Sequence, residues 1–147
     1  MWTRSRRACR NRGFTLIELV VVMIIIALLA GAAVVQVSHR IEMGKRTRAI
    51  QDIATFETAI SLYEADNGDP PTTQQGLQAL RAKPSSPPVP DNWRGPYLKK
   101  NLDKDPWMMD YVYRCPGQLN PDGYDIISYA KDKQPGGTGD DEDLTNE

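Results

Sequence analysis

An unbroken hydrophobic segment follows a short basic stretch at the start of the chain. It runs from Phe14 to Val35, and its only polar side chains are Thr15 and Glu18. At about 1.5 Å per residue, a helix of this length would cross a bilayer core of about 30 Å. The pattern therefore predicts a transmembrane helix. A secretory signal peptide fits less well, because its apolar region spans only roughly 7–15 residues, whereas a plain single-pass anchor remains open.

A second pattern indicates that the helix continues beyond this segment. Apolar residues recur there at three- and four-residue intervals among polar ones: Ile50, Ile53, Phe56, Ile60 and Tyr63. This spacing predicts a helix that runs to about Ala65 and buries one stripe in the core of a small domain. The segment Asp66-Asn-Gly-Asp-Pro-Pro71 ends the helix, because Asn-Gly suits a left-handed cap and proline cannot continue the hydrogen-bond ladder.

The rest of the chain carries weaker helical signals and two strand signals. A short helical pattern covers 73–80, and a proline-rich loop covers 83–90. Segments 111–114 and 124–129 are rich in β-branched and aromatic residues, with Pro-Gly and Pro-Asp-Gly turns between them, which predicts an antiparallel hairpin. The expected fold class is α+β, with one long N-terminal helix packed on a small domain that contains a short antiparallel β-sheet and loops. Because so small a unit buries only a limited hydrophobic core, we expect the long helix, or a metal ion, to add to its stability.

Charge and residue content narrow the function classes. The 147 residues carry 18 Lys and Arg against 19 Asp and Glu, a net charge of −1, which gives no reason to expect a nucleic-acid partner. Five of the arginines lie within residues 1–12, so the positive-inside rule keeps this end cytoplasmic and places the chain after Val35 across the membrane. His39 is the single histidine, and neither a Gly-x-Ser-x-Gly elbow nor a phosphate-binding glycine loop occurs, so we expect no enzyme activity.

The most specific motif is Arg12-Gly-Phe-Thr-Leu-Ile-Glu18 at the start of the apolar segment. Here the chain resembles the type IV pilin superfamily. The resemblance implies that a prepilin peptidase cuts between Gly13 and Phe14 and methylates the new amino group of Phe14. Residues 1–13 would then be a cleaved basic leader, and residues 14–38 a transmembrane and polymerisation helix.

Glu18 has a chemistry that can be argued independently. A carboxylate in an apolar segment costs about 2.5–3.5 kcal/mol at mid-membrane, so it needs a partner. After cleavage the nearest cation would be an α-amino group, with an ordinary pKa of about 7.7–8.0. The amino group of the same Phe14 and that of a neighbouring subunit are both candidates. The resemblance implies the second, a pairing that guides subunits from the bilayer into a filament.

Five further blocks, in order, resemble the protein G family of major pseudopilins of type II secretion. They are Tyr63–Leu80, Trp93–Leu98, Asp105–Trp107, Cys115–Gly117 and Asp122–Ile126. The resemblance implies a structural subunit that forms a periplasmic pseudopilus and helps to drive folded proteins across the outer membrane. Residues 39–66 would be the periplasmic half of the helix and 67–147 a small periplasmic domain. The implied partners are other copies of the chain, minor pseudopilins, the prepilin peptidase and an inner-membrane platform with its cytoplasmic ATPase.

The acidic, glycine-rich end of the chain predicts a calcium site. Clustered carboxylates in a turn-prone loop can supply the six to eight oxygen ligands that calcium prefers. A solvated, disordered acidic tail is the competing interpretation. The resemblance favours calcium, and the candidate ligands are the Tyr129 main-chain oxygen and the side chains of Asp132, Asp140, Asp141 and Asp143. Lys131 and Lys133 depart from the family pattern, which more often has a small residue and a glycine there, and their charges would oppose a dication.

Two alternatives stay open. The chain could be a surface type IV pilin or a minor pilin, although a pair of cysteines closing a C-terminal loop would favour that reading and Cys115 alone does not. It could also be a monomeric, membrane-anchored calcium-binding module whose N-terminus is never cut. A Glu18→Ala change distinguishes the second alternative from a filament subunit. It should abolish assembly of a filament subunit but hardly disturb a simple anchor.

Overall fold

The computed structural model describes residues 13–99 and 104–146, without the side chains of residues 32–37. The predicted leader up to residue 12, the side chain of Val35, and Glu147 lie outside this description. The chain divides into two units, residues 1–39 and residues 40–147. A single helix, α1 (Leu16–Asn67), belongs to both units, and it ends within two residues of the predicted position.

The second half of α1 provides one wall of the core of the 40–147 unit. Ile53, Phe56, Ile60 and Tyr63 are all buried, which confirms most of the predicted apolar stripe. Ile50 is the exception, because 54% of it is exposed. Ala49 is fully buried and lies one turn before Ile53, so it occupies the core-facing position that Ile50 was expected to fill.

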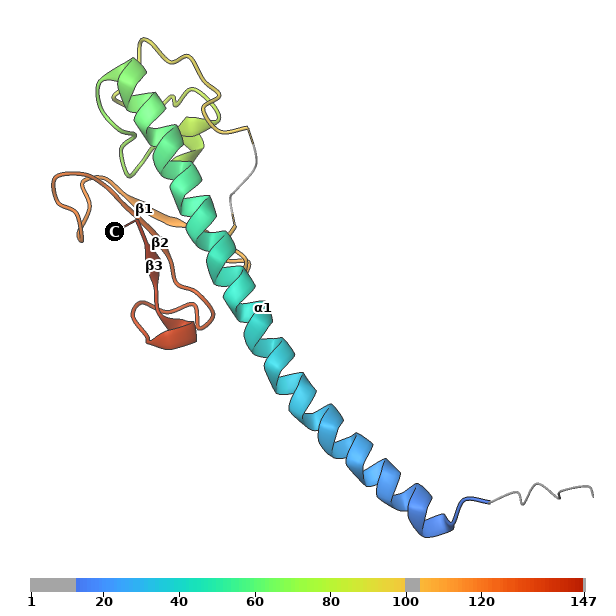
Figure 1. Cartoon of the computed structure of the whole chain (residues 1–147). Coiled ribbons are helices and arrows are strands. Elements are labelled where there is room, and N and C mark those ends of the chain that lie inside the picture. Colours follow the sequence, from blue (N-terminus) through green and yellow to red (C-terminus); the bar gives the residue numbers. More distant parts are fainter. Residues whose placement is uncertain (1–12, 100–103, 147) are drawn as a thin grey trace, which may run out of the picture. The chain divides into compact units, whose positions relative to one another are not determined.

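A three-stranded antiparallel sheet packs beside this helix (Figure 1). The predicted hairpin is confirmed as β1 (Val112–Arg114) and β2 (Asp125–Ser128), with Tyr113 opposite Ile126. The third strand, β3 (Leu144–Thr145), pairs with the free edge of β2. Sequence reasoning did not find β3, because two residues are too short for a periodic pattern to be recognised.

The segment between α1 and the sheet is mostly irregular. The helical pattern at 73–80 forms a turn and a 3₁₀-helix, η1 (Leu77–Leu80), whose Ala79 and Leu80 are buried. Gln75, in the turn before η1, holds the proline-rich loop. Its amide donates hydrogen bonds to the carbonyls of Ser86 (3.0 Å) and Pro88 (2.7 Å). These bonds hold the loop against the turn that follows α1.

Candidate assembly and calcium-binding sites

The predicted processing site precedes the first turn of α1. Gly13 and Phe14 are outside the helix, and 84% of Phe14 is exposed. Thr15 caps the helix, because its hydroxyl accepts a hydrogen bond from the backbone N–H of Glu18 at 3.3 Å. A threonine followed by a glutamate three residues later is a capping-box pattern. The Thr15 cap was missed by the sequence analysis, although this spacing could have revealed it.

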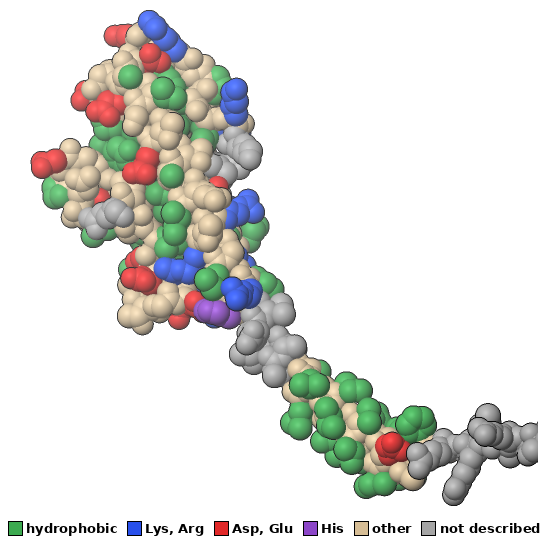
Figure 2. All heavy atoms as spheres, in the orientation of Figure 1, with side chains coloured by type: hydrophobic (Ala, Val, Ile, Leu, Met, Phe, Trp, Pro, Cys, Tyr) green, Lys and Arg blue, Asp and Glu red, His purple; other side chains and the backbone are tan. Residues whose placement is uncertain are grey.

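The helix that follows presents a long hydrophobic surface. Figure 2 shows hydrophobic side chains covering most of this part of the chain. Large apolar residues between Leu16 and Leu29 are 42–83% exposed, and Glu18 is also exposed. The Glu18 carboxylate has no hydrogen bond or ion pair with any described residue. Within the described part of the chain, no helical stretch combines the length and apolarity required to cross a membrane.

The acidic loop follows β2 and contains a short 3₁₀-helix, η2 (Gly139–Asp141) (Figure 1). Two of the candidate ligands fix its turns, since Asp132 Oδ1 accepts a hydrogen bond from the Gln134 N–H (3.1 Å) and Asp143 Oδ2 accepts one from the Gly136 N–H (2.8 Å). The other oxygen, Asp143 Oδ1, is buried and has no hydrogen-bond partner among the described residues. Among those residues, however, no three carboxylate, histidine or cysteine side chains gather at one point.

Arg46 of α1 fastens this loop to the helix. Its guanidinium donates hydrogen bonds to the carbonyls of Glu142 (2.9 Å) and Asp140 (3.4 Å) and lies 3.6 Å from the Glu142 carboxylate. The carbonyls at the end of a 3₁₀-helix lack partners within the helix, so a cation suits this position. Sequence reasoning missed Arg46, because its partners lie almost one hundred positions further along the chain and no local pattern connects them.

Asp140 and Asp141 lie in η2, whereas the main-chain candidate ligand, Tyr129, and the two lysines lie in the turn after β2. The Tyr129 carbonyl accepts a hydrogen bond from the Lys133 N–H at 3.2 Å, which leaves one lone pair on that oxygen. Lys131 and Lys133 are both exposed. Lys133 has a φ of 62°, in the left-handed region that glycine adopts most easily.

A buried carboxylate, that of Asp105, explains one of the short motifs matched in the sequence. Asp105 accepts hydrogen bonds from the N–H groups of Trp107 and Met109, both at 2.9 Å, and from the Ser128 hydroxyl at 2.6 Å. Trp107 in turn donates its indole N–H to Glu42 of α1 at 2.8 Å. This hydrogen bond lowers the pKa of Glu42, against the opposing effect of burial. The Asp-Pro-Trp segment thus connects β2 to the long helix.

Comparison with known proteins identifies the family. Residues 36–147 match the family model of type II secretion system protein G, and residues 9–34 match the prokaryotic N-terminal methylation motif. The chain belongs to the type II secretion system protein G family. It is 44% identical to the type II secretion system core protein G of Pseudomonas aeruginosa, over 93% of this chain and 95% of that protein. It is also 38% identical to the Escherichia coli K12 core protein G, over 96% and 94% of the two chains.

The fold agrees with this assignment. A crystal structure of the major pseudopilin from the type 2 secretion system of enterohaemorrhagic Escherichia coli matches with a TM-score of 0.61 and 35% identity, over 74% of this chain and 91% of that one. The predicted α+β pilin-like fold and the predicted pseudopilin family are both confirmed. The protein G family is one of structural pseudopilin subunits, and membership implies assembly into a pseudopilus. Together with the N-terminal methylation motif, it indicates a membrane-anchored periplasmic protein.

Proposed function

We propose that the chain is made as a single-pass inner-membrane precursor and acts, after processing, as the major subunit of a pseudopilus. A prepilin peptidase cuts between Gly13 and Phe14, and Phe14 is N-methylated. The helices of successive copies then polymerise through residues 14–38, guided by Glu18. The filament works with minor pseudopilins and an inner-membrane platform, whose cytoplasmic ATPase supplies the energy, to drive folded proteins across the outer membrane. The chain itself is not an enzyme.

One observation carries this proposal: an exposed carboxylate lies within an exposed apolar helix, directly after an accessible cleavage motif. The Gly13–Phe14 bond precedes the helix, so a peptidase can bind it in an extended conformation. No described residue of the same unit buries the apolar side chains that follow it. A bilayer and then a bundle of identical helices would supply that burial. The new α-amino group would supply the cation that Glu18 lacks.

The test is the intact mass and N-terminal sequence of the chain extracted from membranes, with and without a prepilin peptidase. We expect a peptidase-dependent product that begins at N-methylated Phe14. The Glu18→Ala variant should be processed in the same way yet yield no filaments. A chain that stays uncut, or is trimmed beyond Val35, would contradict the proposal and favour the anchored calcium-binding module.

We further propose that the acidic loop binds one structural calcium ion. The buried, unpartnered Asp143 Oδ1 supports this proposal, because a buried carboxylate oxygen without a donor costs free energy that a cation would recover. The Tyr129 carbonyl, Asp132, Asp140 and Asp141 are the further candidate ligands. Calcium would supply charge neutralisation here and would fasten the loop between β2 and β3.

A further inference from the structure

A small cavity lies at the C-terminal end of α1. Its volume is about 230 Å³, below the roughly 300–1,000 Å³ of pockets that bind drug-sized molecules, so it suits a single side chain. The last turn of α1 and the proline-rich loop form its walls. Its apolar lining comes from Pro70, Pro88, Val89 and Pro90, and its polar lining includes Asp66, Asn67, Asp69 and Asp91.

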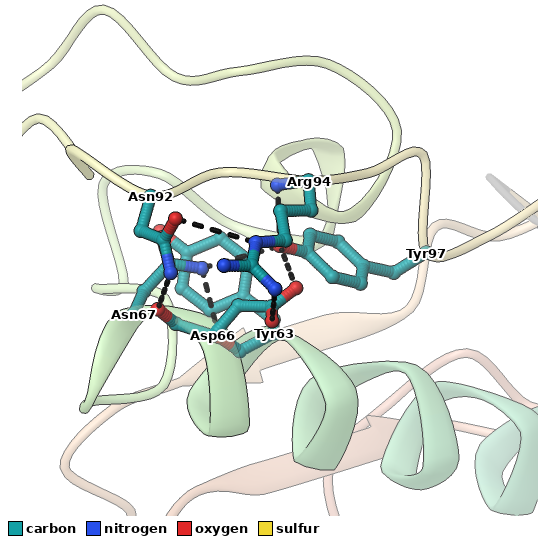
Figure 3. Close-up of polar contacts among 6 residues, drawn as sticks. All are labelled: Tyr63, Asp66, Asn67, Asn92, Arg94 and Tyr97. Atoms are coloured by element: carbon teal, nitrogen blue, oxygen red, sulfur yellow. Dashed lines mark hydrogen bonds and ion pairs between the residues drawn. The ribbon is translucent and has the colours of Figure 1, made fainter.

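One of these carboxylates is already satisfied within the chain (Figure 3). Asp66 accepts a hydrogen bond from the Tyr97 hydroxyl at 2.9 Å, and the Arg94 guanidinium lies 3.9 Å from its other oxygen. Asn92 donates its amide to the Asp66 main-chain carbonyl at 3.0 Å. The hydroxyl of Tyr97 and the guanidinium of Arg94 thus satisfy the carboxylate of Asp66.

Three other polar side chains of the cavity, Asn67, Asp69 and Asp91, have oxygens without a partner among the described residues. Asn67 donates its amide N–H to the Tyr63 carbonyl at 2.8 Å, which fixes the orientation of the amide, while its buried Oδ1 accepts no hydrogen bond from a described residue. Asp69 and Asp91 are exposed and form no ion pair with the described residues. Apolar walls, a buried acceptor and two free carboxylates fit a lysine side chain, which combines an apolar stem with a cationic donor.

A lysine that could enter such a cavity, Lys133, lies at the other end of the same unit. Lys133 is exposed and forms no ion pair with the described residues. Its φ of 62° lies in the left-handed region, which glycine adopts most easily, so Lys133→Gly can be made without strain at this position. The ammonium of Lys133 is an exposed cation without an ion-pair partner among the described residues, and it complements the charge of the two unpaired carboxylates of the cavity.

The two ends are too far apart for Lys133 to reach the cavity of its own chain. Arg46 of α1 holds the acidic loop, and Asp66 borders the cavity. At about 1.5 Å per residue these positions lie about 30 Å apart along α1. Figure 1 likewise shows η2 and the C-terminal end of α1 at opposite ends of this unit.

We propose that Lys133 of one copy inserts into this cavity of a second copy and pairs with Asp69 and Asp91. The inference rests on the proposed filament function. Such a contact joins two different surfaces, and a repeated head-to-tail contact of this type builds an open helical filament. The cavity is thus a contact site between subunits. Lys133, whose charge opposes calcium binding in the acidic loop, contributes to assembly.

The test is zero-length carbodiimide crosslinking of membranes from cells that express the whole secretion system. Carbodiimide joins an ammonium to a carboxylate in direct contact, so mass spectrometry should find Lys133 linked to Asp69 or Asp91 in dimers of the chain. Lys133→Gly should reduce these dimers at least tenfold without unfolding the chain, because glycine suits the local φ. Lys131→Ala, in the same turn, is the matched control and should leave their yield within twofold. The paired variant Lys133→Glu with Asp91→Lys should restore them.

The outcomes separate this contact from the proposed function. Dimers that persist in Lys133→Gly, or a link from Asp91 to a lysine of another protein, would overturn the contact while leaving a processed, filament-forming subunit intact. If the wild-type chain gives neither N-terminal processing nor dimers, the proposed function fails and the contact fails with it.

Discussion

Single buried carboxylates organise much of the small domain. Asp125 is 1% exposed and accepts hydrogen bonds from the backbone N–H groups of Gln118 (2.5 Å), Leu119 (3.0 Å) and Asn120 (3.0 Å). Burial opposes the charge of Asp125, but these bonds and the charge of Arg114 outweigh it, so the pKa of Asp125 is lowered. Gly117 is required beside it, because a Cβ there would collide with Asp125 Oδ1. The carboxylate thus fixes the turn between β1 and β2.

We expect Asp125→Asn to lower the free energy of unfolding by about 2–3 kcal/mol at pH 7, because an amide cannot accept three hydrogen bonds as a carboxylate does. The lowered pKa fixes the sign of the pH dependence. The contribution of Asp125 is complete above its unfolded pKa of about 3.9 and is lost as the pH falls through the folded value. Urea unfolding followed by tryptophan fluorescence should therefore show a constant difference above about pH 5 that narrows below about pH 4.

The exposed Asp122, in the same turn, provides the control. Asp122→Asn should change the free energy of unfolding by less than about 0.5 kcal/mol. A difference between wild type and Asp125→Asn that stays constant down to pH 3 would show that the charge of Asp125 is not what fixes the turn.

At the scale of elements, the second half of α1 is a wall of the core of the 40–147 unit. Phe56 is 1% exposed, and its ring meets Tyr111 edge-to-face at a centroid distance of 5.1 Å. Ile60 and Tyr63 continue the same face. The hydrophobic contacts of this face, rather than helix propensity, hold the sheet and the irregular loops to α1.

Truncation of this face should destabilise the domain strongly. We expect Phe56→Ala to lower the free energy of unfolding by about 3–5 kcal/mol, because it removes a fully buried ring and leaves a cavity. Ile50→Ala is the matched control on the exposed side of α1, with an expected change within about 0.5 kcal/mol. Urea unfolding in detergent measures both. Equal losses for the two variants would mean that Ile50 is buried by a partner under the conditions of the experiment.

The elements that could be predicted from the sequence are those with a repeating local pattern. The 3.6-residue period of Ile53, Phe56 and Ile60 predicted α1, and β-branched segments around turn residues predicted β1 and β2. The misses have a common physical cause, since β3 is fixed by pairing with β2, and Arg46 by carbonyls far along the chain. Ile50 was misplaced because Ala49 and Ile50 are adjacent in the sequence and only packing decides which faces the core. The cleavage motif could be recognised because it is contiguous, whereas the cavity beside Asn67 joins two distant segments.

At the scale of the whole molecule, the acidic loop joins β2 to β3 and holds the last strand in the sheet. Its contacts include short turns, the hydrogen bonds of Arg46 and the partly satisfied carboxylate of Asp143. A ligand that binds the folded loop and not the unfolded chain adds stability by mass action, about 2.7 kcal/mol when its concentration is 100 times the dissociation constant. Calcium should therefore act on the melting of the whole domain and not on the loop alone.

We expect millimolar calcium to raise the melting temperature of the full-length wild-type chain in detergent by several degrees, and an excess of chelator to reverse the change. Asp143→Asn keeps the shape of the side chain but removes the charge, so it should abolish the response while leaving the melting temperature in chelator nearly unchanged. Lys133→Gly should enlarge the response at low calcium, because it removes a cation next to Asp132. Magnesium at the same concentration is the control, since it demands a stricter octahedral geometry than a flexible loop supplies. Equal responses to both metals, or a full calcium response in Asp143→Asn, would place the effect elsewhere on the surface and leave Asp143 as a structural residue of the turn.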